Sequence, residues 1–174
     1  SWNDYRSTSG GGCAPAWSCT SIDSMASICE WEVQSGYAAL TTLPDINGNG
    51  TPELAALGTL SDGIPQVVIK DSDTKELINV ITFGVSAKTP TGITGLLDIN
   101  GNGSPEVAVL LVKSNGTGRV VVRDAKTGAW VGAMSFFGKN CEAKAITSQD
   151  LDGDGVSEIS VLAEKDDGTE VVIQ

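Results

Sequence analysis

The sequence predicts an all-β protein composed of tandem, propeller-like blades, each a four-stranded antiparallel sheet, with two blades complete and the third incomplete. Three observations lead to this class. A segment recurs with a period of 53 and then 52 residues, its apolar runs are short and rich in β-branched residues, and Gly, Asp or Asn bounds each run. The 174 residues, 40% of them hydrophobic, suffice for one domain with a core or for a short tandem array.

The repeat is visible when the chain is aligned with itself. The first copy contains LPDINGNGTPELAAL, the second LLDINGNGSPEVAVL and the third SQDLDGDGVSEISVL. The aspartates Asp45, Asp98 and Asp150 mark equivalent positions, and their spacing lies in the range of propeller blades and other stacked β-units. The array therefore divides into three repeats, at about 37–89, 90–141 and 142–174.

Within each repeat, the apolar runs predict the strands in order. In the first repeat they lie at 38–40, 53–57, 67–69 and 77–81. Turns of matching chemistry, at 71–75 and 124–128, separate the third and fourth strands of the first two repeats. The third repeat ends with a run that aligns with third strands, so we expect it to lack a fourth strand and to expose an edge.

Residues 1–36 do not join the repeat. They carry three of the four tryptophans, Trp2, Trp17 and Trp31, and three of the four cysteines. We interpret this segment as an irregular, disulfide-pinned cap or arm, because a stack of β-units needs its end surfaces covered. A ligand-binding role for the tryptophans, such as stacking on sugar rings, is the alternative.

The cysteines predict two disulfides formed in an oxidising compartment. They are Cys13, Cys19, Cys29 and Cys141. Their spacing is not that of a zinc site, although metal ligation and free thiols stay open as alternatives, and three pairings are possible. Because Cys141 stands where the second repeat meets the third, we expect it to be tied back to the N-terminal segment.

The acidic loops carry the candidate chemistry. Each places oxygen-bearing side chains at positions one, three, five and nine, with Gly at position six to permit a sharp bend. Calcium takes about six to eight oxygen ligands, and the backbone carbonyl at position seven can add one. The expected ligands are Asp45, Asn47, Asn49, Thr51 and Glu53 in the first loop, Asp98, Asn100, Asn102, Ser104 and Glu106 in the second, and Asp150, Asp152, Asp154, Val156 and Glu158 in the third.

An EF-hand is excluded for these loops. The glutamate that an EF-hand needs at position twelve is replaced by Ala56, Val109 and Val161, and the residues that follow have a β pattern. An Asx-rich turn without metal is the remaining alternative. We expect three equivalent calcium sites, the third being the tightest because it contributes four carboxylates and the others two each.

A nine-residue acidic loop before a strand, in copies of this length, resembles the FG-GAP and VCBS repeats of integrin alpha-chain propellers and of many secreted bacterial proteins. The family loop runs Asp-x-Asp-x-Asp-Gly-x-x-Asp, and the pairs Phe83-Gly84 and Phe137-Gly138 resemble the Phe-Gly of the family name. The resemblance covers about residues 37–174. This chain departs from it by Asn at positions three and five of two loops and by Glu at position nine of all three. The resemblance implies calcium binding and a role in adhesion.

Composition narrows the function further. A net charge of −11 disfavours a nucleic-acid partner, and the absence of histidine removes the commonest general base, so we expect no enzyme activity. There is no apolar run of about 20 residues for a membrane span and no leader, which predicts a mature secreted protein.

These observations favour an extracellular, calcium-stabilised structural or adhesive module on a bacterial cell surface. Its partners would be other copies of itself or cell-surface and matrix components, and the open edge of the third repeat would allow self-assembly into a filament by strand complementation. A calcium-dependent carbohydrate-binding module, with glycans as partners, is one alternative. An accessory region of a larger secreted enzyme is the other.

Overall fold

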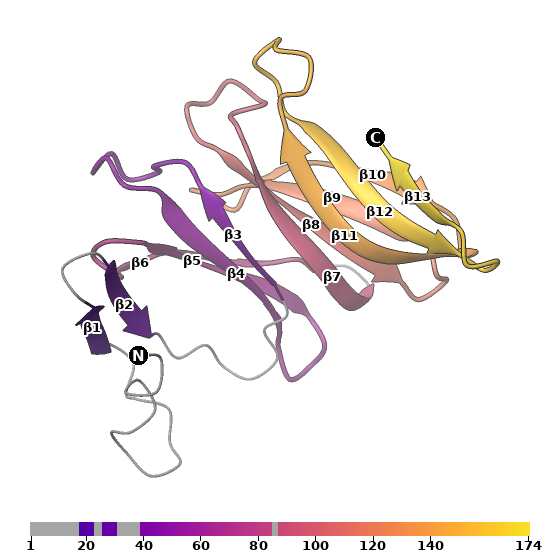
Figure 1. The fold of residues 1–174 in the computed structure, drawn as a ribbon, viewed down its shortest axis with the longest axis horizontal. Helices are drawn as coiled ribbons and strands as arrows, with labels where there is room; N and C mark the ends of the chain where they lie inside the picture. Colours follow the sequence, from indigo (N-terminus) through magenta and orange to yellow (C-terminus); the bar gives the residue numbers. More distant parts are fainter. Residues whose placement is uncertain (1–17, 23–25, 31–38, 85–86) are drawn as a thin grey trace. The chain divides into compact units, whose positions relative to one another are not determined.

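The computed structural model describes residues 18–22, 26–30, 39–84 and 87–174, in which all regular elements are β-strands (Figure 1). The chain divides into two compact units, Ser1–Ser35 and Gly36–Gln174. The first unit contains an antiparallel hairpin of β1 (Ser18–Ile22) and β2 (Ala26–Glu30). In the part of the chain that the structure describes, no helix is long and apolar enough to cross a membrane.

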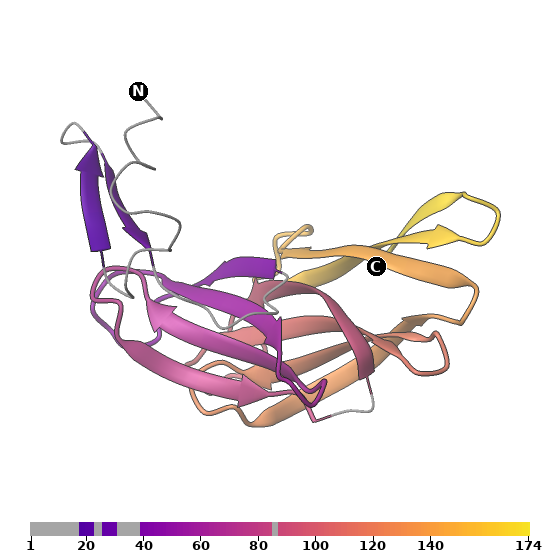
Figure 2. The same cartoon turned by 90° about the horizontal axis from the view of Figure 1, so that it is seen from below.

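The second unit contains three antiparallel sheets whose strands lie in chain order (Figures 1 and 2). The first sheet consists of β3 (Ala39–Leu43), β4 (Glu53–Thr59), β5 (Pro65–Asp71) and β6 (Leu77–Thr82). The second consists of β7 (Ala87–Leu96), β8 (Glu106–Lys113), β9 (Gly118–Asp124) and β10 (Trp130–Phe137). The third consists of β11 (Cys141–Gln149), β12 (Glu158–Lys165) and β13 (Glu170–Ile173). The predicted all-β class is confirmed, with two sheets of four strands and one of three.

A hydrophobic core lies between each pair of neighbouring sheets, so the second unit contains two cores. We call the face of each sheet that meets the next sheet its forward face, and the opposite face its backward face. The first core joins the forward face of the first sheet, Ala55, Leu57, Val67, Ile69 and Ile81, to the backward face of the second, Ile93, Val107, Val109 and Val121. The second joins the forward face of the second sheet, Ala108, Leu110, Val120 and Val122, to the backward face of the third, Val161 and Ala163. Burying each such Val, Leu or Ile contributes about 1.5–3 kcal/mol.

The sheets approach one another most closely at their first strands, β3, β7 and β11. Glycine makes this approach possible on both faces of β7. A Cβ at Gly95 would lie 2.6 Å from the carbonyl oxygen of Thr42 in the first sheet, and one at Gly92 would lie 2.9 Å from Cγ2 of Ile146 in the third. Side-chain packing in the cores and backbone contact at the first strands thus act together.

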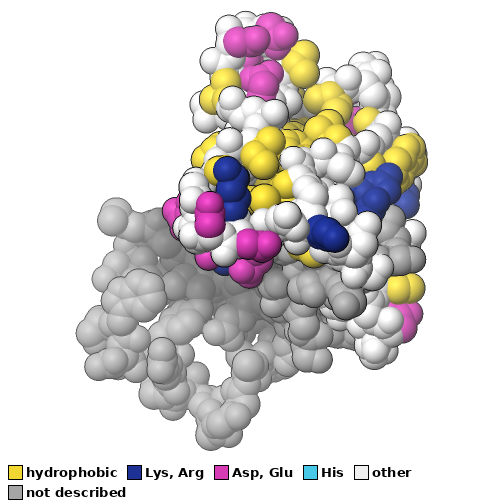
Figure 3. Space-filling view, turned by 90° about the vertical axis from the view of Figure 1, so that its right-hand side faces the viewer, with side chains coloured by type: hydrophobic (Ala, Val, Ile, Leu, Met, Phe, Trp, Pro, Cys, Tyr) yellow, Lys and Arg dark blue, Asp and Glu magenta, His cyan; other side chains and the backbone are white. Residues whose placement is uncertain are grey.

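The third sheet ends in the edge strand β13. Figure 3 views the second unit from the side of this sheet and shows apolar side chains gathered between acidic groups. Val172, at the centre of β13, is 67% exposed. The strand that would complete the sheet at the place of β6 and β10 is absent from the described residues.

The state of Cys141 differs from the predicted disulfide. Cys141 is a free, partly exposed thiol at the start of β11, so the structure shows no disulfide tying it to the N-terminal segment. Cys19 and Cys29 instead occupy directly opposite register positions on β1 and β2. Their backbone register therefore places each beside the other, while Cys13 lies outside the described residues.

Candidate metal centre

The three acidic loops occupy the same place in each sheet, between the first and second strands. The last residue of each loop is the first residue of the second strand: Glu53 begins β4, Glu106 begins β8 and Glu158 begins β12. The backbone turns sharply at positions four and six of each loop. In the first loop these are Gly48 and Gly50, with φ of 83° and 86°, in the left-handed region that glycine adopts without strain.

The aspartate at position one closes each loop in the same way. Asp45 accepts hydrogen bonds from the backbone N–H of Gly48 at 2.6 Å and of Gly50 at 2.7 Å. Asp98 and Asp150 accept equivalent bonds from the two glycines of their own loops. Donation by Gly50 is the main cause that lowers the pKa of Asp45. The loops are therefore closed around a charged carboxylate.

The glutamate at position nine accepts the N–H of position two in each loop. The bonds are Ile46 N–H to Glu53 at 3.0 Å, Ile99 N–H to Glu106 at 2.9 Å and Leu151 N–H to Glu158 at 2.7 Å. Burial of the first two glutamates raises their pKa, despite these hydrogen bonds. In each loop, the side chain at position nine is thus hydrogen-bonded to the backbone at position two, seven residues earlier in the chain.

Two carboxylates that the sequence did not identify as site residues, Asp71 and Asp124, are buried at the ends of β5 and β9. Register places Asp71 opposite Glu53 and Asp124 opposite Glu106, so each faces a loop from the neighbouring strand. Their equivalent positions, 53 residues apart, were the available signal. The sequence pattern by itself predicts only hairpin turns at both positions.

Asp71 connects the first loop to the hairpin that follows β5. Its Oδ1 accepts the backbone N–H of Asp73 at 2.8 Å and of Thr74 at 2.6 Å. Its Oδ2 accepts the side-chain amides of Asn47 at 2.8 Å and Asn49 at 2.5 Å. The Thr74 bond is the largest of the effects that together hold the pKa of Asp71 far below its usual range.

Asp124 does the same in the second repeat. Its Oδ1 accepts the N–H and the hydroxyl of Thr127, both at 2.6 Å, and its Oδ2 accepts the Asn102 amide at 2.7 Å. Burial raises the pKa of Asp124, but these hydrogen bonds outweigh it and the pKa is lowered. The second loop has one more amide contact, from Asn100 to Glu106 at 2.5 Å.

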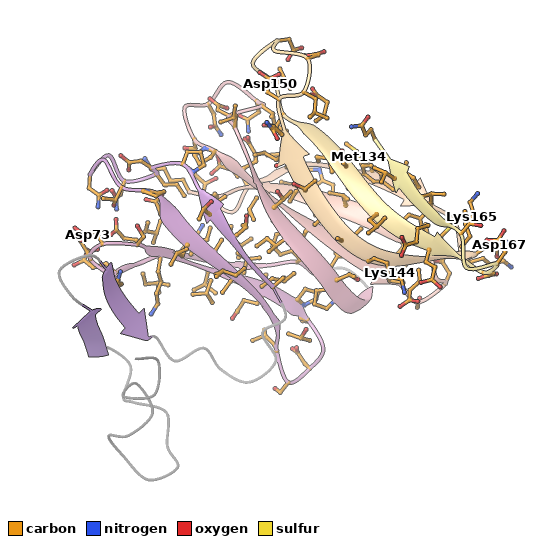
Figure 4. All side chains as sticks on the ribbon, viewed as in Figure 1. Asp73, Met134, Lys144, Asp150, Lys165 and Asp167 are labelled. Carbon is orange, nitrogen blue, oxygen red and sulfur yellow. The ribbon has the colours of Figure 1, made fainter. Side chains whose placement is uncertain are left out.

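The third loop has the same backbone hydrogen bonds but carboxylates in place of the amides (Figure 4). Asp150, Asp152 and Glu158 bring carboxylate oxygens within 4.8 Å of one another, a group that could hold a metal ion. Hard carboxylate oxygens on a glycine-bent loop suit calcium. The carboxylate of Asp154 instead accepts the N–H of Val156.

The remaining predicted ligands of the first two loops make hydrogen bonds within their loops. Asn47 Oδ1 accepts the N–H of Asn49, and Asn49 Oδ1 accepts the N–H and hydroxyl of Thr51. The N–H of Ser104 likewise donates to Asn102 Oδ1. The amide nitrogens, rather than the amide oxygens, face the buried aspartates.

Comparison with protein-family models and with curated proteins found no match. The resemblance to FG-GAP and VCBS repeats therefore rests on the loop motif and the threefold repeat.

Proposed function

We propose that this chain is an extracellular, calcium-stabilised structural or adhesive module of FG-GAP and VCBS type. Its sheets act as propeller-like blades, and it assembles with copies of itself by strand addition along β13. Cell-surface or matrix components of a bacterium are the other partners we propose, and no catalytic activity is part of the proposal. The observation that carries it is the edge strand β13, which pairs with β12 alone among the described residues and carries the 67% exposed Val172.

The edge of β13 supports strand addition. In the first two sheets, the equivalent edges are occupied: β5 pairs with β6, and β9 pairs with β10. An edge with unpaired N–H and C=O groups accepts another strand, and exposed apolar residues such as Val172 favour such pairing. A strand from a second copy would therefore complete the sheet.

The third loop supports calcium as the stabilising ion. Its four carboxylates lie at one end of the hairpin of β11 and β12, the hairpin on which β13 pairs. Carboxylates so close repel one another, and a bound cation reverses the sign of that interaction. Calcium would then stabilise the folded third sheet by mass action.

Opposite register of Cys19 and Cys29 supports a secreted location. Opposed residues in an antiparallel pair have Cα atoms about 4.5–5.5 Å apart, within the range of a disulfide. Thiol–disulfide exchange with an oxidised small thiol would form the bond and release two reduced thiols. We expect peptide mapping of the native, unreduced protein to show Cys19 joined to Cys29. A free thiol at both positions would contradict a secreted location.

The tryptophans on which a carbohydrate-binding role depended, Trp2, Trp17 and Trp31, lie outside the described residues. That alternative accordingly gains no support from the geometry.

Electron microscopy of the native chain, with millimolar calcium and with a chelator, tests the proposal. We expect filaments or rings in calcium and their loss in chelator. A synthetic peptide with the sequence of residues 129–138, which spans β10, should occupy the edge of β13 and block assembly, whereas a scrambled peptide should not. Monomers under every condition would overturn the self-assembly part of the proposal.

A further inference from the structure

We infer that the backward face of the first sheet and the forward face of the third form a head-to-tail interface between two copies of this chain. The inference rests on the proposed self-assembly and names the surfaces that make it. Within the chain, a forward face packs on a backward face twice, at the two cores. One face of each kind remains without a neighbouring sheet in the second unit.

The backward face of the first sheet carries a continuous apolar row. Cross-strand register aligns Leu40, Ala56, Val68 and Val80 across its four strands. The equivalent row of the second sheet is buried in the first core and consists of Ile93, Val109, Val121 and Ala133. The equivalent row of the third sheet contributes to the second core and consists of Ile146, Val161 and Ile173.

Exposure distinguishes the first row from its buried equivalents. Leu40 is 60% exposed, whereas its equivalent Ile93 is 6% exposed. Val80, on the outermost strand of the same row, is 43% exposed. The row of the first sheet is therefore open at Leu40 and Val80, while Ala56 at its centre is 4% exposed.

The forward face of the third sheet offers the matching row. Leu57, Val67 and Ile81 form this row in the first sheet and are buried in the first core. The equivalents of Leu57 and Val67 in the third sheet are Leu162 and Val172. Ala145 of β11 lies opposite Leu162 and belongs to the same row. The row stays apolar although Ala145 and Val172 are exposed and Leu162 is half-buried.

The surroundings of this row keep the face soluble before assembly. The next row on the loop side is polar, Thr147 with Ser160, where the inner sheets bury Ala55 and Ala108. On the other side lies an acidic row. Its members are Glu142, Glu164 and Glu170, and Lys144 pairs with the first two at 2.8 and 2.9 Å. An apolar centre with a polar rim is typical of an interface that forms between soluble chains.

A second copy fits this surface because the chain already contains the interface twice. At the second core, Ile146 of the backward row packs over Gly92 of the preceding forward face. At the first core the position of Gly92 is taken by Ala39, which packs against the core that contains Ile93. In the intermolecular contact, Leu40 takes the place of Ile93 and Ala145 takes the place of Ala39. A contact between two different faces is heterologous, and it generates a ring or a filament according to the rotation between copies.

The test uses two single variants, L40E and V172E. Each substitutes an exposed side chain on one of the two faces, so each monomer should fold. Burying the new carboxylate at the contact should weaken association by roughly 100-fold. Asn115→Asp adds the same charge in an exposed hairpin turn of the middle sheet; it is the matched control and should assemble as the native chain does.

Mixing the two variants gives the decisive result. The L40E chain keeps an intact third-sheet face and the V172E chain keeps an intact first-sheet face. With the edge of β13 occupied by the peptide of residues 129–138, the mixture should therefore form a 1:1 heterodimer and stop there. Sedimentation velocity or native mass spectrometry measures this. Assembly of L40E alone to the native extent would overturn the inference while leaving strand addition along β13 intact. A native chain that stays monomeric would overturn both.

Discussion

The three acidic loops have the same backbone hydrogen bonds, but the first two differ from the third in how their negative charges are balanced. In the first loop, the amides of Asn47 and Asn49 donate to the buried Asp71, so the loop is closed by its own hydrogen bonds. In the third loop, Asp152 and Asp154 stand at the same positions. The carboxyl oxygens of this loop cannot donate to one another while they are ionised.

The same loop geometry is therefore compatible both with closure by hydrogen bonds and with binding of a cation. A cation in the first loop would require the amides to turn their oxygens inward and to give up their bonds to Asp71. A cation in the third loop would displace no such bond among the described residues and would relieve repulsion instead. We therefore expect the third loop to be the tightest site and the first two to be largely independent of calcium.

The largest effect is expected from giving the first loop the charges of the third. In N47D/N49D, two new carboxylates replace amides that lie 2.8 and 2.5 Å from Oδ2 of Asp71. In chelator, the melting temperature should fall by on the order of 10 °C, because three carboxylates would then meet at one point. Calcium should restore most of the loss, as differential scanning calorimetry would show.

Asn115→Asp is the control for that variant, since Asn115 lies in an exposed hairpin turn. Its melting temperature should match that of the native chain. An N47D/N49D chain that melts normally in chelator would show that the amide bonds to Asp71 are unimportant.

The next effect is expected at Asp124. In D124A, the N–H and hydroxyl of Thr127 and the amide of Asn102 lose their acceptor. Losing three part-buried hydrogen bonds to a charged acceptor is costly, so the melting temperature should fall by about 5–10 °C with or without calcium. Asp73→Ala, at an exposed position in the equivalent hairpin of the first repeat, is the control (Figure 4). Equal melting of the two variants would contradict the role assigned to Asp124.

Calcium itself should act through the third loop. Saturation to about 10–100 times the dissociation constant contributes roughly 1.4–2.7 kcal/mol, and thus raises the melting temperature by a few degrees. D152N/D154N, which copies the first loop, should abolish most of this rise. Calorimetry in calcium and in chelator measures both values. A calcium response that survives in the variant would assign the ion to another loop.

A smaller effect is expected from pH. The pKa of Glu106 is raised by burial, so its contribution to stability is full below its unfolded value near 4.5 and is lost as the pH rises through the folded pKa. Asp98, whose pKa is lowered by the Gly103 N–H, behaves oppositely and contributes above about 3.8. E106Q should therefore gain stability relative to the native chain between pH 4 and 7, measured by melting in chelator. A constant difference across this range would exclude the titration of Glu106.

The smallest effect compares the first two repeats with each other. Lys75 has a φ of 66° in the turn after β5, where the equivalent residue after β9 is Gly128, with a φ of 72°. K75G should stabilise the chain by about 0.5–1 kcal/mol because glycine adopts this conformation without strain. Denaturant titration checks the sign, and Gly128→Lys should shift the midpoint in the opposite direction.

The sequence predicted the sheets well because strand, turn and repeat signals all have short range. Short apolar runs and turn glycines identify β4 and β8 from a few positions, and the repeat supplies their equivalents. The role of Asp71 escaped this reasoning because it depends on register. Eighteen residues separate Asp71 from Glu53, and only antiparallel pairing of β4 with β5 brings them opposite each other.

The sequence predicts a tie from Cys141 to the N-terminal segment, whereas the structure contains Cys141 as a free thiol. That prediction used the position of Cys141 in the repeat, and position along a chain does not determine which thiols meet. The register of β1 and β2 places Cys19 opposite Cys29, a relation that requires knowledge of the hairpin. The number of strands in the third sheet, by contrast, could be counted from the alignment of the repeats.

The two glycines of β7 have a consequence for how far the array can bend. Gly95 and Gly92 let β7 approach a neighbouring sheet on each side, so successive sheets are hinged along their first strands. In the proposed assembly, the angle between sheets would set how many copies complete one revolution. A methyl group at either position would force the first strands apart and lessen that angle. G92A and G95A chains should therefore form assemblies of larger radius. The distance of β7 from β3 and from β11 would thus determine the curvature of the assembly.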